Sequence, residues 1–137
     1  MTVYLDTSSL VKLYVDEPES DIVAAEAAEA DMLVTSVLAY PEFCAMVGRR
    51  RREKVISKPE EARLLERFRG DWPSILTIAM DEDLAAKAGQ LAIAHGLRGA
   101  DAVHLASFVR VLETSDDDDV RFRCADDRLT KAARKVG

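Results

Sequence analysis

The sequence has no apolar run approaching the ~18 residues that a membrane-spanning helix requires. Its first residues also lack a basic segment followed by an apolar core, the pattern of a secretory signal peptide. Both absences argue against a membrane protein or an exported one. We therefore expect a cytoplasmic protein without a membrane partner.

Cysteine is scarce, because the chain contains only Cys44 and Cys124. These two residues are far apart and show no metal-ligand spacing. Two isolated thiols in an intracellular chain are usually reduced structural residues. The sequence thus favours neither a disulfide nor a zinc site.

Positive charge is also in short supply, with 19 Lys and Arg against 25 Asp and Glu and a net charge of -6. A general polyanion-binding surface is therefore not expected, since affinity for phosphate backbones comes mainly from Lys and Arg. The one basic stretch runs from Arg49 to Arg52, with Lys54 nearby, at the end of an expected helix. It is either a solvated helix end that suits the helix dipole or a local contact for phosphates or a partner.

The 137 residues that are present suit one folded domain. Hydrophobic residues make up 48% and charged residues 32% of the chain, which is far from disordered composition. No composition break marks a linker. We expect a single domain that covers residues 1–137.

Short apolar runs alternate with helical patterns along the chain. Strands are expected at residues 3–5, 32–35, 75–79 and 120–124, and helices at 8–15, 21–30, 36–52, 59–69, 82–95, from about 97, and after 126. The last strand alternates apolar and basic residues, which is typical of an edge strand. This order predicts an α/β fold with a parallel sheet.

Local signals define several helix ends. Ser57 and Glu60 form a capping-box pattern, and Gly70 is expected to end the helix that they begin. Asp81 and Gly96 are expected to cap the two ends of another helix. Ser20 is a candidate helix cap on the same grounds.

Four acidic residues lie where an expected element meets a loop. Asp6 ends the first strand and Asp126 stands just beyond the last, while Glu42 and Asp101 lie near the starts of helices. In open α/β sheets, ligands bind outside the carboxyl ends of the strands. We therefore expect these four carboxylates to gather at one end of the sheet.

Each acid also has an ordinary structural explanation. Asp6 suits a turn, Glu42 a boundary position, Asp101 the first turn of a helix, and Asp126 a helix cap. His104 is expected to be a core or boundary histidine with one hydrogen bond rather than a ligand or a base. The acidic run at residues 116–119 is expected to be a solvated loop, because it lacks the spacing of a calcium loop.

Carboxylates that gather at one place repel one another and raise one another's pKa, so a cation is the simplest reason for such a group. Oxygen ligands without a nearby Cys or His pair suit Mg²⁺ or Mn²⁺. Such an ion can lower the pKa of a bound water and orient it toward a phosphodiester. The pattern predicts metal-dependent phosphoryl chemistry.

Four motifs in order resemble the PIN-domain ribonucleases and, within them, the VapC-type toxins of bacterial and archaeal toxin–antitoxin pairs. The similarity extends from residue 3 to about 133. The motifs are residues 6–14 followed by Glu17 and Pro18, the helix glutamate Glu42, residues 98–106, and residues 125–129. Two departures are Pro41 directly before Glu42, and Cys124 where many relatives carry Thr or Ser.

The resemblance implies a PIN-like three-layer sandwich, in which helices cover both faces of a central parallel sheet of four or five strands. It implies RNA cleavage that depends on Mg²⁺ or Mn²⁺, with Asp6, Glu42, Asp101 and Asp126 as catalytic and metal-binding residues. A homodimer silenced by a small cognate antitoxin is also expected.

The same resemblance gives a hydroxyl residue a candidate role, and positive charge makes several arginines candidates as well. Thr7 or Ser8 matches a hydroxyl that orients a metal-bound water. Arg98 joins Arg49, Arg50, Arg51 and Arg52 as a candidate contact for RNA or a partner.

Two other functions stay open. One is a catalytically silent PIN-like module that binds an antitoxin or RNA. The other is a phosphotransferase with Asp6 as acceptor, although position 8 is serine where such enzymes usually carry a second acid.

Overall fold

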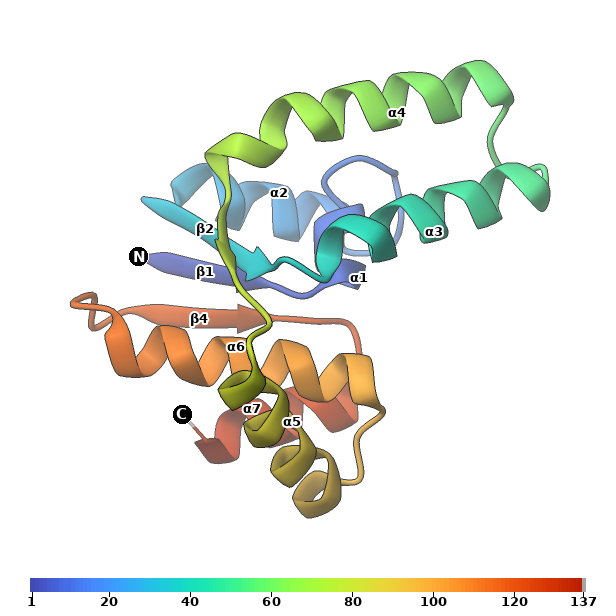
Figure 1. Cartoon of the computed structure of the whole chain (residues 1–137). Helices are drawn as coiled ribbons and strands as arrows, with labels where there is room; N and C mark the ends of the chain where they lie inside the picture. Colours follow the sequence, from blue (N-terminus) through green and yellow to red (C-terminus); the bar gives the residue numbers. More distant parts are fainter. Residues whose placement is uncertain (137) are drawn as a thin grey trace.

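The computed structural model describes residues 1–136, in which four parallel strands form one sheet (Figure 1). The strand order is β3-β2-β1-β4, and each neighbouring pair is parallel. The strands are β1 Thr2–Leu5, β2 Met32–Ser36, β3 Leu76–Ile78 and β4 Val120–Arg123. The predicted parallel α/β sheet is confirmed, with four strands.

Helices cover both faces of this sheet, which gives the expected three layers (Figure 1). Helices α1 to α4 pack on one face, and α5 to α7 pack on the other. The helices are α1 Thr7–Val11, α2 Ser20–Glu29, α3 Ala39–Arg52, α4 Lys58–Asp71, the 3₁₀ turn η1 Trp72–Ser74, α5 Glu82–His95, α6 Gly99–Thr114 and α7 Asp127–Val136.

Strand β1 lies inside the sheet and contributes to both cores. Val3 and Leu5 pack with α1 to α4, while Tyr4 packs with α5 to α7. Successive side chains of a strand point to opposite faces, so a strand covered on both sides is apolar throughout. Asp6 follows directly after this buried strand.

Aromatic stacking consolidates each core. The rings of Phe43 and Phe68 stack with centroids 3.8 Å apart and join α3 to α4. On the other face, Tyr4 stacks on Phe122 of β4 at 5.5 Å. The far ends of α3 and α4 extend away from the sheet as an arm (Figure 1).

Several predicted helix ends are confirmed. Ser57 and Glu60 form a reciprocal capping box at the start of α4. The Asp81 carboxylate accepts from the backbone N–H of Leu84 at the start of α5. Gly96 adopts a left-handed φ of 63° at its end, a conformation that glycine adopts without strain.

The prediction that Gly70 ends its helix is wrong. Helix α4 continues to Asp71 and passes into η1. The indole of Trp72 packs 5.3 Å from Phe68 and 5.2 Å from Tyr40, measured between ring centroids. This tertiary packing holds the chain in helical form past the glycine.

The first two helices also differ from prediction. Helix α1 ends at Val11, and residues 12–14 continue as tighter turns closed by i→i+3 hydrogen bonds. Ser20 is the first residue of α2 rather than its cap, and Glu19 before it has φ 72°. The Ser20 hydroxyl instead bonds backbone groups of Val15 and Glu17. A loop contact thus replaces the predicted cap.

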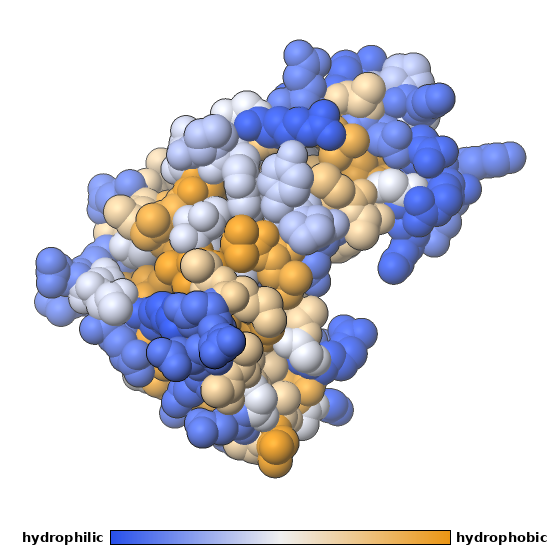
Figure 2. Space-filling model, viewed as in Figure 1, coloured by the Kyte–Doolittle hydropathy of each residue, from blue (hydrophilic) through white to orange (hydrophobic). Residues whose placement is uncertain are grey.

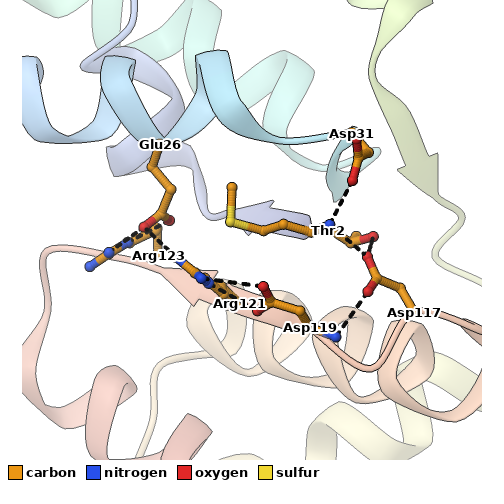
Figure 3. Close-up of polar contacts among 8 residues, drawn as sticks. Thr2, Glu26, Asp31, Asp117, Asp119, Arg121 and Arg123 are labelled. Carbon is orange, nitrogen blue, oxygen red and sulfur yellow. Dashed lines mark hydrogen bonds and ion pairs between the residues drawn. The ribbon is translucent and has the colours of Figure 1, made fainter.

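Strand β4 is an edge strand, as predicted. Its outward residues Arg121 and Arg123 pair with the buried carboxylate of Glu26 on α2 (Figure 3). At the amino end of the sheet, Asp117 accepts from the Thr2 hydroxyl at 2.8 Å. Asp119 pairs with Arg121, so the acidic loop is partly bound rather than fully solvated.

The described helices have neither the length nor the apolar character to cross a membrane.

Candidate active site

The carboxyl ends of β1, β2 and β4 and the start of α6 lie on the same side of the sheet (Figure 1). This arrangement follows from parallel pairing, since every loop that leaves a strand then starts from one end of the sheet. Each of the four predicted acids lies on a segment that begins there. We call this the carboxyl end of the sheet.

Asp6 is buried where β1 meets α1, with 5% of its surface exposed. Its Oδ1 accepts from the backbone N–H of Ser9 at 2.9 Å and from the hydroxyl of Ser8 at 2.8 Å. Burial raises the pKa of Asp6, and these hydrogen bonds offset only part of that rise. Asp6 therefore caps a helix and also places a poorly solvated carboxylate at the carboxyl end of the sheet.

Glu42 lies in the first turn of α3, one residue after Pro41, where proline needs no N–H donor. Its Oε1 accepts from the hydroxyl of Thr7 at 2.6 Å and lies 2.9 Å from Nε2 of His104. Burial raises the pKa of Glu42, but hydrogen bonds from His104 and Thr7 outweigh it, so the pKa lies below its usual value. The carboxylate is thus held in its charged form.

His104 has more partners than the sequence suggested. It is buried on α6 and contacts Tyr4, Thr7 and Glu42, whereas one hydrogen bond was predicted. We call Tyr4, Thr7, Glu42 and His104 the Glu42 network. No local pattern signals this network, because its contacts join residues that are 35 to 100 positions apart in the chain.

Thr7 and Ser8 are adjacent but serve different acids. Thr7 donates to Glu42, while Ser8 donates to Asp6. The Ser8 hydroxyl also accepts from the backbone N–H of Ala125 at 3.5 Å, which joins the loop after β1 to the loop after β4. The two hydroxyls thus connect three of the segments that carry the acids.

Asp126 is exposed and caps α7, where its Oδ1 accepts from the backbone N–H of Leu129 at 2.9 Å. Burial and the negative charges of Asp6 and Asp126 raise the pKa of the Cys124 thiol to about 11. Both carboxylates therefore lie near this thiol. The cap explains the position of Asp126 but does not occupy its second oxygen.

Asp101 lies in the first turn of α6, and about one fifth of its side chain is exposed. Arg98 approaches it at 3.5 Å from a position that is 86% exposed, so this ion pair is weak. His104 turns toward Glu42 and Thr7 rather than toward Asp101. The Asp101 carboxylate therefore has one weak ion pair and no hydrogen bond from His104.

The molecular surface is notched between the α3–α4 arm and the end formed by α5 and α6 (Figure 2). The arm that borders this notch is strongly hydrophilic (Figure 2). The notch lies on the side toward which β1, β2 and β4 point (Figure 1). The segments that carry the four acids begin on this same side of the sheet (Figure 1).

The family profile described as PIN domain matches residues 3–134. Two relatives from Mycobacterium tuberculosis, Ribonuclease VapC45 and Ribonuclease VapC49, are each 37% identical over 109 residues, covering 80% of this chain and 76% of theirs. The chain is a PIN-domain protein of the VapC type. Ribonuclease VapC46 from the same species is 33% identical over 135 residues, covering 98% of the PIN chain and 92% of its own.

A solved structure supports the fold of this PIN domain. A chain of the crystal structure of FitAcB from Neisseria gonorrhoeae superposes with a TM-score of 0.67 and 20% identity. The superposition covers 96% of this chain and 93% of the other. At that identity the likeness concerns the arrangement of strands and helices alone.

The donor chemistry of the PIN site fits a hard divalent ion, since Asp6 and Glu42 supply carboxylate oxygens at partly buried positions. Among residues 1–136, no three His, Cys, Asp or Glu side chains are grouped closely enough to hold a metal ion. Mg²⁺ typically keeps several waters and takes one or two carboxylates together with substrate phosphates. The residues therefore suit an ion that binds with water and substrate.

The four consecutive arginines at the end of α3 differ in their contacts. Arg50 pairs with Glu17, and Arg51 donates to Glu61 at 2.6 Å. Arg49 and Arg52 are exposed, and neither has an ion-pair partner in the described part of the chain. Only these two are available for a phosphate without loss of an internal contact.

Proposed function

We propose that the chain is a metal-dependent endoribonuclease, the toxin of a toxin–antitoxin pair, and that residues 1–137 form one PIN domain. The observation that carries this proposal is the hydrogen-bonded connection of Asp6, Glu42 and the Asp126 loop through Thr7, Ser8 and His104. Relatives at 37% identity that carry the name ribonuclease support it.

Asp6 and Glu42 would hold a Mg²⁺ or Mn²⁺ ion together with waters and substrate phosphates. Asp101 and Asp126 would approach the ion when RNA enters, because no three of the acids are grouped closely enough in the described residues. When bound, the ion lowers the pKa of water and neutralises charge on the phosphodiester. Ser8 and the N–H of Ser9 fix the orientation of Asp6. Thr7 and His104 hold one oxygen of Glu42.

The acids Asp101 and Asp126 and the two hydroxyl residues have different roles in this proposal. Asp101 and Asp126 are more exposed than Asp6, so their carboxylates can turn as RNA enters. Thr7 and Ser8 already donate to Glu42 and Asp6, and we assign them the role of setting these carboxylates rather than binding substrate.

The RNA would run along the notch beside the arm. Arg49 and Arg52 would contact its phosphates, and Arg98 would do so from the start of α6. Arg50 and Arg51 were candidates on the same grounds, but their pairs with Glu17 and Glu61 assign them to the arm itself. A net charge of -6 restricts RNA contact to such local groups.

A homodimer is part of the proposal. An apolar groove of about 420 Å³ lies between α5 and α6, lined by Leu38, Met80, Ala88, Ala92, Ala102 and Val103. Met80 is 49% exposed and the nearby Ile93 of α5 is 88% exposed. A dimer would cover this surface, and light scattering should then give about twice 15.1 kDa.

A small cognate antitoxin would silence the enzyme, and the pair would act in the cytoplasm, where the RNA is found. A short upstream reading frame that encodes a small DNA-binding protein would support this arrangement. Co-expression of that protein should abolish the RNA cleavage of the purified complex.

The direct test incubates purified, antitoxin-free protein with tRNAs and rRNA fragments in Mg²⁺, in Mn²⁺ and in a chelator. Cleavage should require the ion and disappear in Asp6→Asn. Asp116→Asn is the matched control, because Asp116 is exposed in the loop before β4. Cleavage that persists in chelator or in Asp6→Asn would remove the metal-nuclease mechanism, and RNA binding without cleavage would favour the silent module.

A further inference from the structure

We propose that His104 is a positioning residue that fixes one oxygen of Glu42 toward the divalent ion, with the Tyr4 hydroxyl fixing the imidazole in turn. This inference rests on the proposed function, because it concerns how the same site holds its metal. His104 itself touches neither substrate nor ion in this scheme.

The imidazole is held at both nitrogens. Nδ1 lies 2.9 Å from the Tyr4 hydroxyl, and Nε2 lies 2.9 Å from Oε1 of Glu42 and 3.0 Å from the Thr7 hydroxyl. The rings of Tyr4 and His104 meet edge to face with centroids 6.0 Å apart. These contacts join β1, α1, α3 and α6 at one buried point.

The hydrogen-bond partners assign the proton on the ring. The Thr7 hydroxyl directs its only hydrogen to Glu42 at 2.6 Å, so toward His104 its oxygen can only accept. The Glu42 carboxylate also accepts, so Nε2 must carry hydrogen. Nδ1 is then free to accept from the Tyr4 hydroxyl, whose oxygen lies 2.9 Å away.

The arrangement at Glu42 favours a functional role over simple core packing. Both donors, Thr7 and His104, reach Oε1. Among the described residues no donor reaches Oε2, and the side chain is 30% exposed. Oε1 is therefore fixed, and Oε2 is left for a cation or for a water bound to the cation. Residues that hydrogen-bond a metal ligand commonly orient it in this way.

A histidine that served packing alone would behave differently. Its loss would lower stability, but it would not change the affinity for an ion in a way that depends on Glu42. Tyr4, Phe108 and Phe122 form an aromatic cluster around the same site, so some loss of stability is expected in either case. The test must therefore measure ion binding separately from folding.

The experiment measures Mn²⁺ affinity by calorimetry and by electron paramagnetic resonance, with melting in chelator recorded for every variant. His104→Leu should weaken Mn²⁺ binding about tenfold, the usual cost of removing a group that orients a ligand. His104→Gln keeps an N–H donor near the place of Nε2 and should restore most of the affinity. Tyr4→Phe, a milder change, should weaken binding about threefold.

A double-mutant cycle connects the effect to Glu42. In a Glu42→Ala background, His104→Leu should cause no further loss of Mn²⁺ affinity. His95→Leu is the matched control, because His95 is the other histidine of the chain and lies at the end of α5. It should bind Mn²⁺ as the parent does.

Two results would overturn the proposal for His104 while the proposed function stands. One is unchanged Mn²⁺ affinity in a folded His104→Leu or Tyr4→Phe variant. The other is an equal loss with and without Glu42. A parent protein that binds no Mn²⁺ and cleaves no RNA would overturn this inference and the proposed function together.

Discussion

The hydroxyl of Thr7 donates a hydrogen bond of 2.6 Å to Oε1 of Glu42. The two residues are 35 positions apart in the chain, one at the start of α1 and the other in the first turn of α3. This contact joins the segment after β1 to the segment after β2. It makes Thr7 the simplest position at which to test how the site holds its carboxylates.

Thr7→Val should weaken Mn²⁺ binding about tenfold, because it removes a donor that orients Glu42 while keeping the side-chain shape. RNA cleavage at limiting Mn²⁺ should fall by a similar factor. Thr7→Ser retains the hydroxyl and is the matched control. Calorimetry and initial rates check both variants, and a Thr7→Val protein equal to the parent would contradict the role of the hydroxyl.

Asp6→Asn should raise the free energy of unfolding at pH 7 in chelator while it abolishes cleavage. Burial raises the pKa of Asp6 in the folded state, so its ionised form destabilises the fold at neutral pH. That penalty disappears as pH falls below the ordinary value of 3.8. Urea unfolding at several pH values should therefore show the two proteins converging in acid.

The control for this measurement is Asp116→Asn, an exposed change at the other end of the sheet that should leave the unfolding free energy unaltered. An Asp6→Asn protein that is less stable than the parent at pH 7 would mean that the hydrogen bonds from Ser8 and Ser9 outweigh the burial of the carboxylate.

Replacement of Arg49 and Arg52 by Gln should weaken RNA binding and leave the cleavage rate at saturating RNA unchanged. Two lost phosphate contacts should reduce the slope of log affinity against log salt by about 1.4 for single-stranded RNA. The double change at Arg50 and Arg51 is the comparison. It should chiefly lower stability, because these side chains pair with Glu17 and Glu61.

Filter binding across a salt series and thermal melting separate the two double variants. An unchanged salt slope after replacement of Arg49 and Arg52 would exclude the arm as the phosphate contact.

Glu26→Gln should lower the free energy of unfolding by about 1 kcal/mol at pH 7, a modest loss because its arginine partners are partly solvated. The hydrogen bond from Arg123 lowers the pKa of Glu26, so this contribution is present above the ordinary value of 4.5. This stabilisation is lost as the pH falls through the pKa that Glu26 has in the folded protein, which is below 4.5. Urea unfolding at pH 7 and at acidic pH measures the loss of stability in Glu26→Gln and its dependence on pH.

Cleavage should not change in Glu26→Gln, because the Glu26 carboxylate pairs with Arg121 and Arg123 and contacts none of the four candidate acids (Figure 3). A loss of activity without a loss of folding would show that the pairing of Arg123 influences Asp6, whose backbone N–H donates to the carbonyl of Arg123 at 3.1 Å.

Much of the fold could be predicted from local patterns. The capping box at Ser57 and Glu60, the cap at Asp81 and the glycine at Gly96 act within one helical turn, and the structure confirms each. Gly70 does not end its helix, because Trp72 packs on Tyr40 of α3, a contact that only the tertiary structure supplies. A local sequence signal therefore sets a helix end only where no contact with a distant residue stabilises a different conformation.

The candidate acids could be proposed from the sequence, because a strand end followed by an acid can be recognised from neighbouring residues alone. Parallel pairing then required Asp6, Glu42 and Asp126 to begin from one end of the sheet. The partners of each carboxylate were decided only by the tertiary structure. His104 is 62 residues from Glu42, and Arg50 is 33 from Glu17, so no local pattern encodes these contacts. The first contact arises when α3 and α6 pack on opposite faces of the sheet, and the second when the end of α3 meets the loop between α1 and α2.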